Sequence, residues 1–223
     1  MQRFFDIIFS GLALLVFSPF LIPIALLLRF TGEGEIFYIQ QRVGKGSNMF
    51  GLFKFATMLK NSPNMNLGTV TVKNDPRILP MGNFLRKTKI NELPQLINIF
   101  LGDMSVIGPR PQTQRCFDAF PKRSQDAIIQ VKPGLSGIGS IVFRDEENML
   151  DNPDIDRLQF YDDVIAPYKG ELEEWYVKHH TLYSYFALIG LTVWVIIFSD
   201  SKVYKKLFKD LPQPSGELAT IMS

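Results

Sequence analysis

LRKTKINELPQLINIFLGDMSVIGPRP, residues 85–111, joins a basic cluster, a helix start and a rigid turn in one stretch. Asn91 is a preferred N-cap residue and Pro94 is tolerated in a first helical turn, so a helix is predicted to begin at Asn91–Pro94. Apolar residues then recur at helical spacing until Gly102: Leu93, Leu96, Ile97, Phe100 and Leu101. Glu92 is therefore expected at a helix N-terminus, where amides and the helix dipole favour anions.

Cations stand on both sides of this predicted helix. Arg86, Lys87 and Lys89 precede it, and Arg110 follows it between Pro109 and Pro111. The two prolines fix the backbone around one guanidinium, which suits bidentate phosphate binding. An ordinary capped helix with surface charges is the alternative that these residues leave open.

The N-terminal segment is apolar enough for a membrane. Residues 7–28 carry no charge, and about 20 apolar residues are enough to cross a bilayer. Ser18-Pro19 and Pro23 interrupt the helix pattern; each proline removes a hydrogen bond, and the serine hydroxyl can occupy a freed carbonyl. A kink is predicted, and a kinked segment can either span the bilayer or turn back. A signal peptide is disfavoured because no small-residue cleavage site follows.

Composition and charge support a membrane protein. Hydrophobic residues make up 46% of the 223, with 19 phenylalanines, and the single Cys116 cannot form an intrachain disulfide. Residues 1–132 hold 16 Lys and Arg against 8 Asp and Glu, while residues 133–223 hold 8 against 14. The basic first half suits lipid headgroups and nucleotide phosphates. Nucleic acid is not an expected partner, because it would leave the apolar segments unexplained.

The remaining segments predict an α+β fold, mainly helical with a small β-hairpin. Glu35–Val43 and Met49–Met58 form the hairpin, with a turn of about five residues between them. Helices broken at Pro121 are expected within 112–130, and a short strand at Ile138–Phe143. Residues 182–198 are uncharged and rich in aromatic residues, and lysines follow. An interfacial amphipathic helix in the membrane plane would keep both the basic block after Arg29 and these lysines in the cytoplasm.

Several motifs resemble the bacterial sugar transferases, the monotopic polyprenyl-phosphate phosphoglycosyl transferases. They are Leu85–Thr88, Glu92–Leu96, Gly102–Ser105 and Gly108–Pro111, together with Ser18-Pro19. The resemblance implies an enzyme at the cytoplasmic face of the bacterial inner membrane. It would transfer a phosphosugar from a UDP-sugar to polyprenyl (undecaprenyl) phosphate, release UMP and start glycan assembly.

The resemblance also implies a domain organisation. Residues 1–30 would form a kinked re-entrant membrane helix, residues 31–180 a cytoplasmic catalytic domain, and residues 181–223 an interfacial helix with a basic tail. Expected partners are the UDP-sugar donor, the polyprenyl phosphate acceptor and membrane lipids. The sequence leaves the sugar and the oligomeric state open, a homodimer being one alternative.

The resemblance also implies site residues, from the same motifs and from Asn74–Arg77, which resembles the family's segment with an Arg near the donor. Glu92 and Asn91 occupy the family's catalytic dyad, in which an Asp attacks the donor's β-phosphate. Phosphate and substrate contacts are expected from Arg77, Arg86, Lys87, Pro109, Arg110 and Pro111. The implied cofactor is Mg²⁺, with Glu92 as its expected protein ligand.

Asn91 departs from the family pattern, because a neutral amide cannot act as an anionic nucleophile. Three explanations are open. Glu92 acts as the nucleophile or as a base for direct transfer; Asn91 is an engineered trap of a natural Asp; or the chain is a catalytically inactive, membrane-bound substrate-binding or assembly partner of a glycan pathway.

Overall fold

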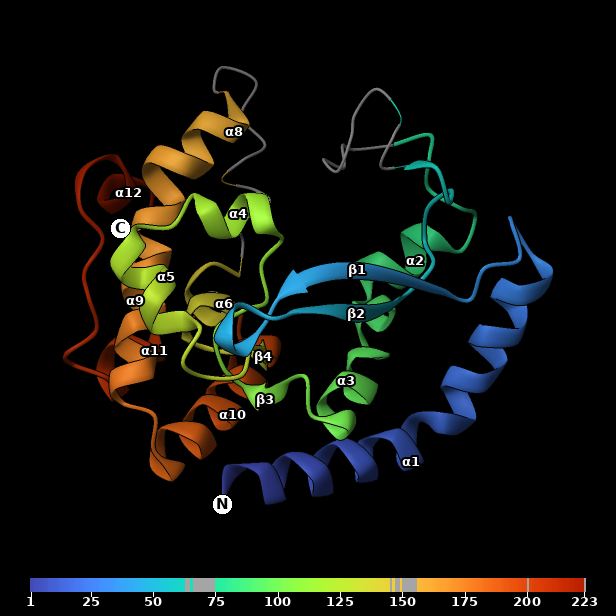
Figure 1. The fold of residues 1–223 in the computed structure, drawn as a ribbon, viewed down its shortest axis with the longest axis horizontal. Helices are drawn as coiled ribbons and strands as arrows, with labels where there is room; N and C mark the ends of the chain where they lie inside the picture. The colour runs from blue at the N-terminus through green and yellow to red at the C-terminus, as the bar shows by residue number, and fades with distance from the viewer. Residues whose placement is uncertain are drawn as a thin grey trace. The chain divides into compact units, whose positions relative to one another are not determined.

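The computed structural model describes residues 1–62, 65, 75–144, 146, 149, 156–199 and 201–222. The described chain is mainly helical, with two two-stranded sheets (Figure 1). It divides into two compact units. One consists of residues 1–6, 42–50 and 102–223, and the other of residues 7–41 and 51–101. The predicted fold class, mainly helical with a small β-hairpin, is confirmed.

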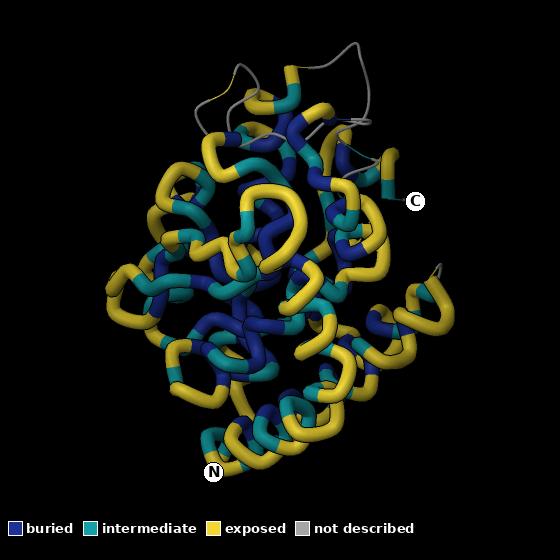
Figure 2. The backbone as a smooth tube through the Cα atoms, turned by 90° about the vertical axis from the view of Figure 1, so that its right-hand side faces the viewer, coloured by how far each residue is buried: buried dark blue, intermediate teal, exposed yellow. Residues whose placement is uncertain are grey.

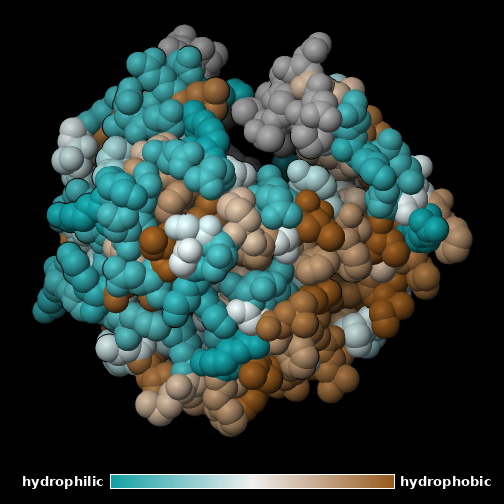
Figure 3. All heavy atoms as spheres, viewed as in Figure 1, coloured by the Kyte–Doolittle hydropathy of each residue, from teal (hydrophilic) through white to brown (hydrophobic). Residues whose placement is uncertain are grey.

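Helix α1, Gln2–Phe30, is the predicted apolar N-terminal helix. Among the described residues it is the one helix long and apolar enough to cross a membrane. Apolar atoms gather over it in Figure 3, and Figure 2 shows exposed residues recurring along the helix that starts at N. Many large apolar side chains are exposed along it, among them Leu12, Leu15, Val16, Phe20, Ile22, Leu26 and Leu27. Such a surface suits lipid better than water.

The hairpin is formed by β1, Phe37–Val43, and β2, Met49–Phe55. A 3₁₀ turn, η1 at Lys45–Ser47, joins them, with φ of 67° at Gly46. The predicted hairpin and its turn are therefore confirmed. Strand β2 ends before Met58, which instead forms an isolated bridge with Ile78.

The unit formed by residues 7–41 and 51–101 has its own apolar core. Leu28 from α1, Phe55 from β2 and Leu85 from α2, Gly82–Lys87, pack together there. Gly82 is required at the start of α2, because a Cβ at that position would lie 2.2 Å from the Thr57 carbonyl oxygen. The core thus fixes the helix that carries Arg86 and Lys87.

The predicted helix start at Asn91 is wrong. Helix α3 spans Gln95–Leu101, and Asn91 and Glu92 belong to a separate 3₁₀ turn, η3 at Ile90–Glu92. Lys89 precedes that turn in the left-handed region, with φ of 58°, and its carbonyl accepts the Glu92 N–H. Glu92 therefore does not occupy the N-terminus of a long helix, as the capping pattern had suggested.

The buried face of α3 also differs from the predicted one. Leu96 and Ile99 are buried, whereas Phe100 and Leu101 are 45% and 66% exposed. The reason is Asn98, which is fully buried. It accepts the Phe53 N–H at 2.9 Å and donates to the Gly51 carbonyl at 2.8 Å, so a polar side chain pairs with strand β2.

The other unit is built around a short parallel sheet. Strand β3, Ser105–Ile107, pairs with β4, Gly134–Ser136, with Ser105 opposite Gly134 and Ile107 opposite Ser136. The remaining elements of this unit are α4 Gln114–Asp118, α5 Lys122–Ile128, α6 Ile138–Val142, α8 Arg157–Phe160, the π-helix η4 Tyr161–Ile165, α9 Ala166–Lys178, α10 Leu182–Ile197, α11 Val203–Leu207 and α12 Gly216–Ile221.

The helices α4 and α5 confirm the break at Pro121, and α10 confirms the C-terminal apolar helix. The predicted strand at Ile138–Phe143 is wrong, because this segment forms α6. Ile138, Ile141 and Val142 are all buried, a spacing that serves a helix as well as a strand. A short apolar run does not distinguish the two by periodicity.

Asp6 anchors the first turn of α1 to this unit. Its Oδ1 accepts hydrogen bonds from the Ser105 hydroxyl, the Val106 amide and the Tyr185 hydroxyl, each at 2.9 Å. Asp6 is only 2% exposed. A buried carboxylate with three donors is well satisfied, so Asp6 joins α1, β3 and α10.

Candidate active site

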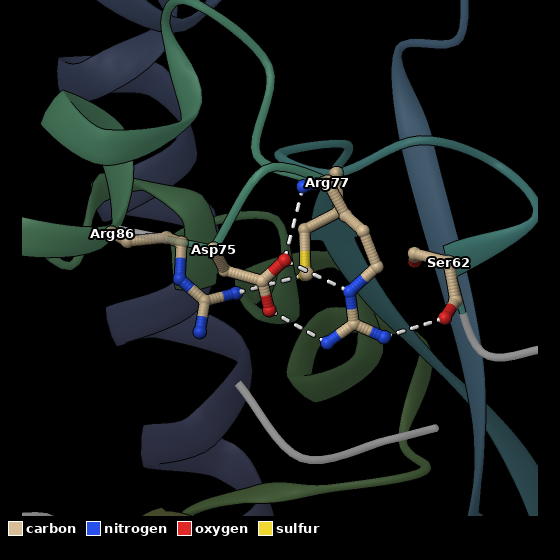
Figure 4. A network of polar contacts seen from close by, with 5 residues as sticks. Ser62, Asp75, Arg77 and Arg86 are labelled. Atoms are coloured by element: carbon tan, nitrogen blue, oxygen red, sulfur yellow. Dashed lines mark hydrogen bonds and ion pairs between the residues drawn. The ribbon is translucent and has the colours of Figure 1, made fainter. Parts of the chain in front are cut away.

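Arg77 lies in a buried polar network. Its Nε and Nη2 donate to the two carboxylate oxygens of Asp75 at 2.9 and 2.6 Å, and its Nη1 donates to the Ser62 carbonyl at 2.7 Å. Figure 4 shows this arrangement, with the guanidinium lying between the carboxylate and the Ser62 carbonyl. The hydrogen bond to Asp75 raises the pKa of Arg77 further.

Because Arg77 is only 3% exposed, its fixed contacts are internal. They connect Asp75 and Arg77 to Ser62. Direct contact of Arg77 with a substrate phosphate stays a prediction, and its hydrogen bonds show that Arg77 links Asp75 to Ser62.

Helix α2 presents the basic cluster. Leu85 is fully buried in the core, whereas Lys87 is exposed and Arg86 partly buried. The Nη1 of Arg86 lies 3.5 Å from the Met58 Sδ and joins the same network (Figure 4). One buried leucine therefore orients two adjacent cations.

The dyad position lies just beyond α2. Asn91 is 8% exposed, and its Oδ1 has no hydrogen-bond partner among the described residues. Glu92 is partly buried in the same turn. A buried, unsatisfied carbonyl oxygen costs about 1–3 kcal/mol, and such groups often mark functional sites.

The Gly108–Pro111 segment is held by its backbone. The Gly108 N–H donates to the Ser136 carbonyl, and the Pro109 carbonyl accepts the Gly134 N–H. The Pro111 carbonyl accepts from Arg42 Nη1 at 3.1 Å. These bonds make the turn rigid on both sides of Arg110.

The predicted residues form two groups, each within one unit. Arg77, Arg86, Lys87, Asn91 and Glu92 belong to the unit that contains residues 51–101. Pro109, Arg110 and Pro111 belong to the unit that contains residues 102–223.

Sequence reasoning missed Glu173 on α9. Its Oε1 accepts the Arg110 N–H at 3.4 Å, and the residue is only 1% exposed. Burial raises the pKa of Glu173 to about 7, against the opposing effects of the Arg110 amide and of Lys169. In the sequence, Glu173 stands in an acidic helical run that is typical of a solvated face, so no signal distinguished it.

Binding of Mg²⁺ stays a prediction. Within the described parts of the chain, no three His, Cys, Asp or Glu side chains form a group that could hold a metal ion. Of the acidic residues after Phe143, Asp145 lies outside the described residues, and Glu146 is paired with Lys169 at 2.5 Å. Glu92 as a Mg²⁺ ligand also stays a prediction; Mg²⁺ commonly binds one or two carboxylates together with phosphate oxygens.

Comparison with known proteins agrees with these motifs. The family model for bacterial sugar transferase matches residues 1–199. The undecaprenyl-phosphate galactose phosphotransferase of Salmonella typhimurium is 31% identical over 214 residues, which cover 90% of this chain and 41% of the relative. The exopolysaccharide production protein ExoY of Rhizobium meliloti is 33% identical over 159 residues, 65% of this chain and 70% of the relative.

A third relative is the UDP-N-acetylgalactosamine-undecaprenyl-phosphate N-acetylgalactosaminephosphotransferase of Aeromonas hydrophila. It is 35% identical over 143 residues, which cover 63% of this chain and 34% of the relative. The chain therefore spans well under two thirds of the length of the Aeromonas and Salmonella proteins. A family match over residues 1–199 nevertheless defines the class: this chain belongs to the bacterial sugar transferase family.

Proposed function

We propose that this chain transfers a phosphosugar from a UDP-sugar to undecaprenyl phosphate and releases UMP. The observation that carries the proposal is the family match over residues 1–199, with relatives named for sugar-phosphate transfer to undecaprenyl phosphate. The apolar helix α1 and the cations of α2 fit this chemistry. One substrate is soluble and the other lies in a membrane, so an active site at the membrane surface can meet both.

The cations would act on phosphate charge. Phosphoryl transfer depends mainly on positioning and electrostatic stabilisation, so a few fixed groups are sufficient. Arg86 and Lys87 from α2, and Arg110 between its two prolines, would neutralise phosphate oxygens. Arg77 would support them by holding Asp75 and Ser62 together.

Glu92 would perform the chemistry that Asn91 cannot. In one route its carboxylate oxygen attacks the donor's β-phosphorus and the bond to the UMP oxygen breaks; the lipid phosphate oxygen then displaces the carboxylate. In the other route Glu92 takes a proton from the lipid phosphate, which attacks the β-phosphorus directly. Mg²⁺ held by Glu92 and phosphate oxygens would neutralise part of the developing charge.

The membrane arrangement belongs to the same proposal. Helix α1 would kink at Pro19 and re-enter the cytoplasmic side. Pro19 lacks the N–H that would serve the Leu15 carbonyl, and the Ser18 hydroxyl donates to that carbonyl at 2.8 Å. The ribbon of α1 changes direction along its length in Figure 1. Residues 31–180 would lie in the cytoplasm, and α10 would lie in the interface.

Activity can be tested with purified protein, undecaprenyl phosphate and a panel of UDP-sugars, by measuring UMP release. We expect release by the wild-type chain and its loss in Glu92→Gln. Activity only in Asn91→Asp would instead indicate a trapped or lost nucleophile. Donor binding without turnover in either protein would support the inactive substrate-binding partner and contradict the proposal.

Topology has a separate test. Cysteine-accessibility labelling in intact cells should find residues near Met1 and residues near Ser223 protected from an impermeant external reagent. Labelling of a cysteine near Met1 from outside would contradict the re-entrant arrangement. A single-cysteine variant in residues 31–180 serves as the matched cytoplasmic control.

A further inference from the structure

The Arg110 amide has an unusual partner. Pro109 and Pro111 have no N–H, so Arg110 supplies the one backbone donor of this three-residue turn. That donor points to the Oε1 of Glu173 at 3.4 Å. The contact joins α9 to the turn across 63 positions of the sequence.

Gly139 makes room for this carboxylate. A Cβ on Gly139 would lie 2.3 Å from Oε1 and 3.0 Å from Cδ of Glu173. Any side chain there would push the carboxylate from its place. Gly139 on α6 is therefore required for the observed position of the Glu173 carboxylate.

Burial of the Glu173 carboxylate costs free energy. Its Oε2 has no hydrogen-bond partner among the described residues, and the residue is 1% exposed. The groups with an electrostatic influence on it are Arg110 on the turn, and Lys169 and Tyr176 on its own helix. Lys169 is already paired with Glu146. A core residue without a functional task would be expected to be apolar here.

We propose that Glu173 is a positioning residue for Arg110: it holds the amide of the proline-flanked turn and so sets the direction of the guanidinium toward a substrate phosphate. The inference rests on the proposed phosphosugar transfer, because it assigns Arg110 a phosphate contact. Glu173 itself touches no substrate. It acts through the backbone of Arg110.

Three variants test this role by UMP-release kinetics. Glu173→Met removes the acceptor, and we expect the KM for the UDP-sugar or the lipid phosphate to rise about tenfold, with a smaller change in kcat. Glu173→Gln keeps a carbonyl oxygen at the same place and should restore KM to within about twofold of wild type. Gly139→Ala leaves Glu173 unchanged but displaces its carboxylate, so it should share the KM effect of Glu173→Met.

Glu174→Met is the matched control. Glu174 is the next residue of α9, is 4% exposed, and accepts from Arg123 and Ser124, two residues of α5. Its loss should lower stability without raising KM. Equal KM changes in Glu173→Met and Glu174→Met, or a failure of Glu173→Gln to restore KM, would overturn the inference.

Arg110→Gln separates this inference from the function itself. If wild-type protein turns over and Arg110→Gln raises KM while Glu173→Met and Gly139→Ala do not, only the role of Glu173 is refuted. If the wild-type chain shows no turnover with any donor, the proposed function fails first. Should Glu173→Met not fold, Glu173→Gln and Gly139→Ala still decide the matter.

Discussion

The Asp75 carboxylate and the Arg77 guanidinium form a two-pronged ion pair in which both side chains are nearly inaccessible to water, 0% and 3% exposed. Removing one partner would leave the other charged and buried. We expect Arg77→Met to lower the free energy of unfolding by clearly more than the loss of a solvent-exposed ion pair does. Thermal unfolding in a fixed detergent would measure it.

The control for this prediction is a solvent-exposed ion pair with a similar donor–acceptor distance. Arg115 and Asp162 are bonded at 2.9 Å, with side chains 45% and 40% exposed. Arg115→Gln should cost at most about 1 kcal/mol, because solvent screens the pair. Similar losses for the two variants would show that burial does not set the strength of the Arg77 contact.

Glu173 should make stability depend on pH. Its pKa is about 7 in the folded protein and near 4.5 in the unfolded chain, so the folded state binds the extra proton between these values. The contribution of Glu173 to stability is therefore greatest below pH 4.5 and falls by about 3 kcal/mol as pH rises to 7. Glu173→Gln should flatten that part of the profile. An identical slope in both proteins would exclude Glu173 as its source.

Gly82 and Gly190 offer a paired test of close packing. A Cβ on Gly82 would meet the Thr57 carbonyl oxygen at 2.2 Å, whereas a Cβ on Gly190 in α10 would meet nothing within 4 Å. Gly82→Ala should destabilise the protein by about 1–3 kcal/mol through overpacking. Gly190→Ala should be neutral or stabilising by up to about 1 kcal/mol, as expected for a helix interior. Thermal unfolding of both variants in the same detergent decides the sign.

Ser18 provides a test of the proposal that helix α1 lies in a membrane. Ser18→Ala removes the hydroxyl that serves the Leu15 carbonyl beside Pro19. In lipid this carbonyl has no water to replace the lost donor, so we expect stability in nanodiscs to fall by about 1–3 kcal/mol. Ser18→Thr keeps the hydroxyl and should retain most of the stability. A loss in Ser18→Thr equal to that in Ser18→Ala would contradict the assigned hydrogen bond.

Much of the fold could be predicted because its signals are local. Three signals depend only on nearby residues. The uncharged run before Arg29 predicts the apolar helix, Gly44–Gly46 predict the hairpin turn, and Pro121 predicts the helix break. The two strands β3 and β4 were missed because each is three residues long and finds its partner far along the chain. The segment Ile138–Val142 was assigned the wrong type because its apolar run suits either structure.

The candidate site shows the same division. Motifs predict Arg86, Asn91, Glu92 and Arg110 as site residues, since their neighbours in sequence carry the information, and these assignments stay predictions. The capping pattern misplaced the helix start, because Lys89 takes a left-handed conformation and a 3₁₀ turn precedes α3. The contact of Glu173 with Arg110 could not be predicted from the sequence. It depends on tertiary packing and on the missing side chain of Gly139, which leaves space for the carboxylate.

The hydrogen bond from Tyr185 to Asp6 joins residues 179 positions apart, and Asp6 also accepts from Ser105 and Val106. During synthesis, the first turn of the chain must therefore wait for its partners until most of the polypeptide has left the ribosome. The segments 7–41 and 51–101 have no such requirement and can pack earlier. Under the proposed membrane arrangement, we expect the nascent protein to enter the bilayer before Asp6 and Tyr185 meet, so that lipid insertion precedes completion of the unit that holds Arg110.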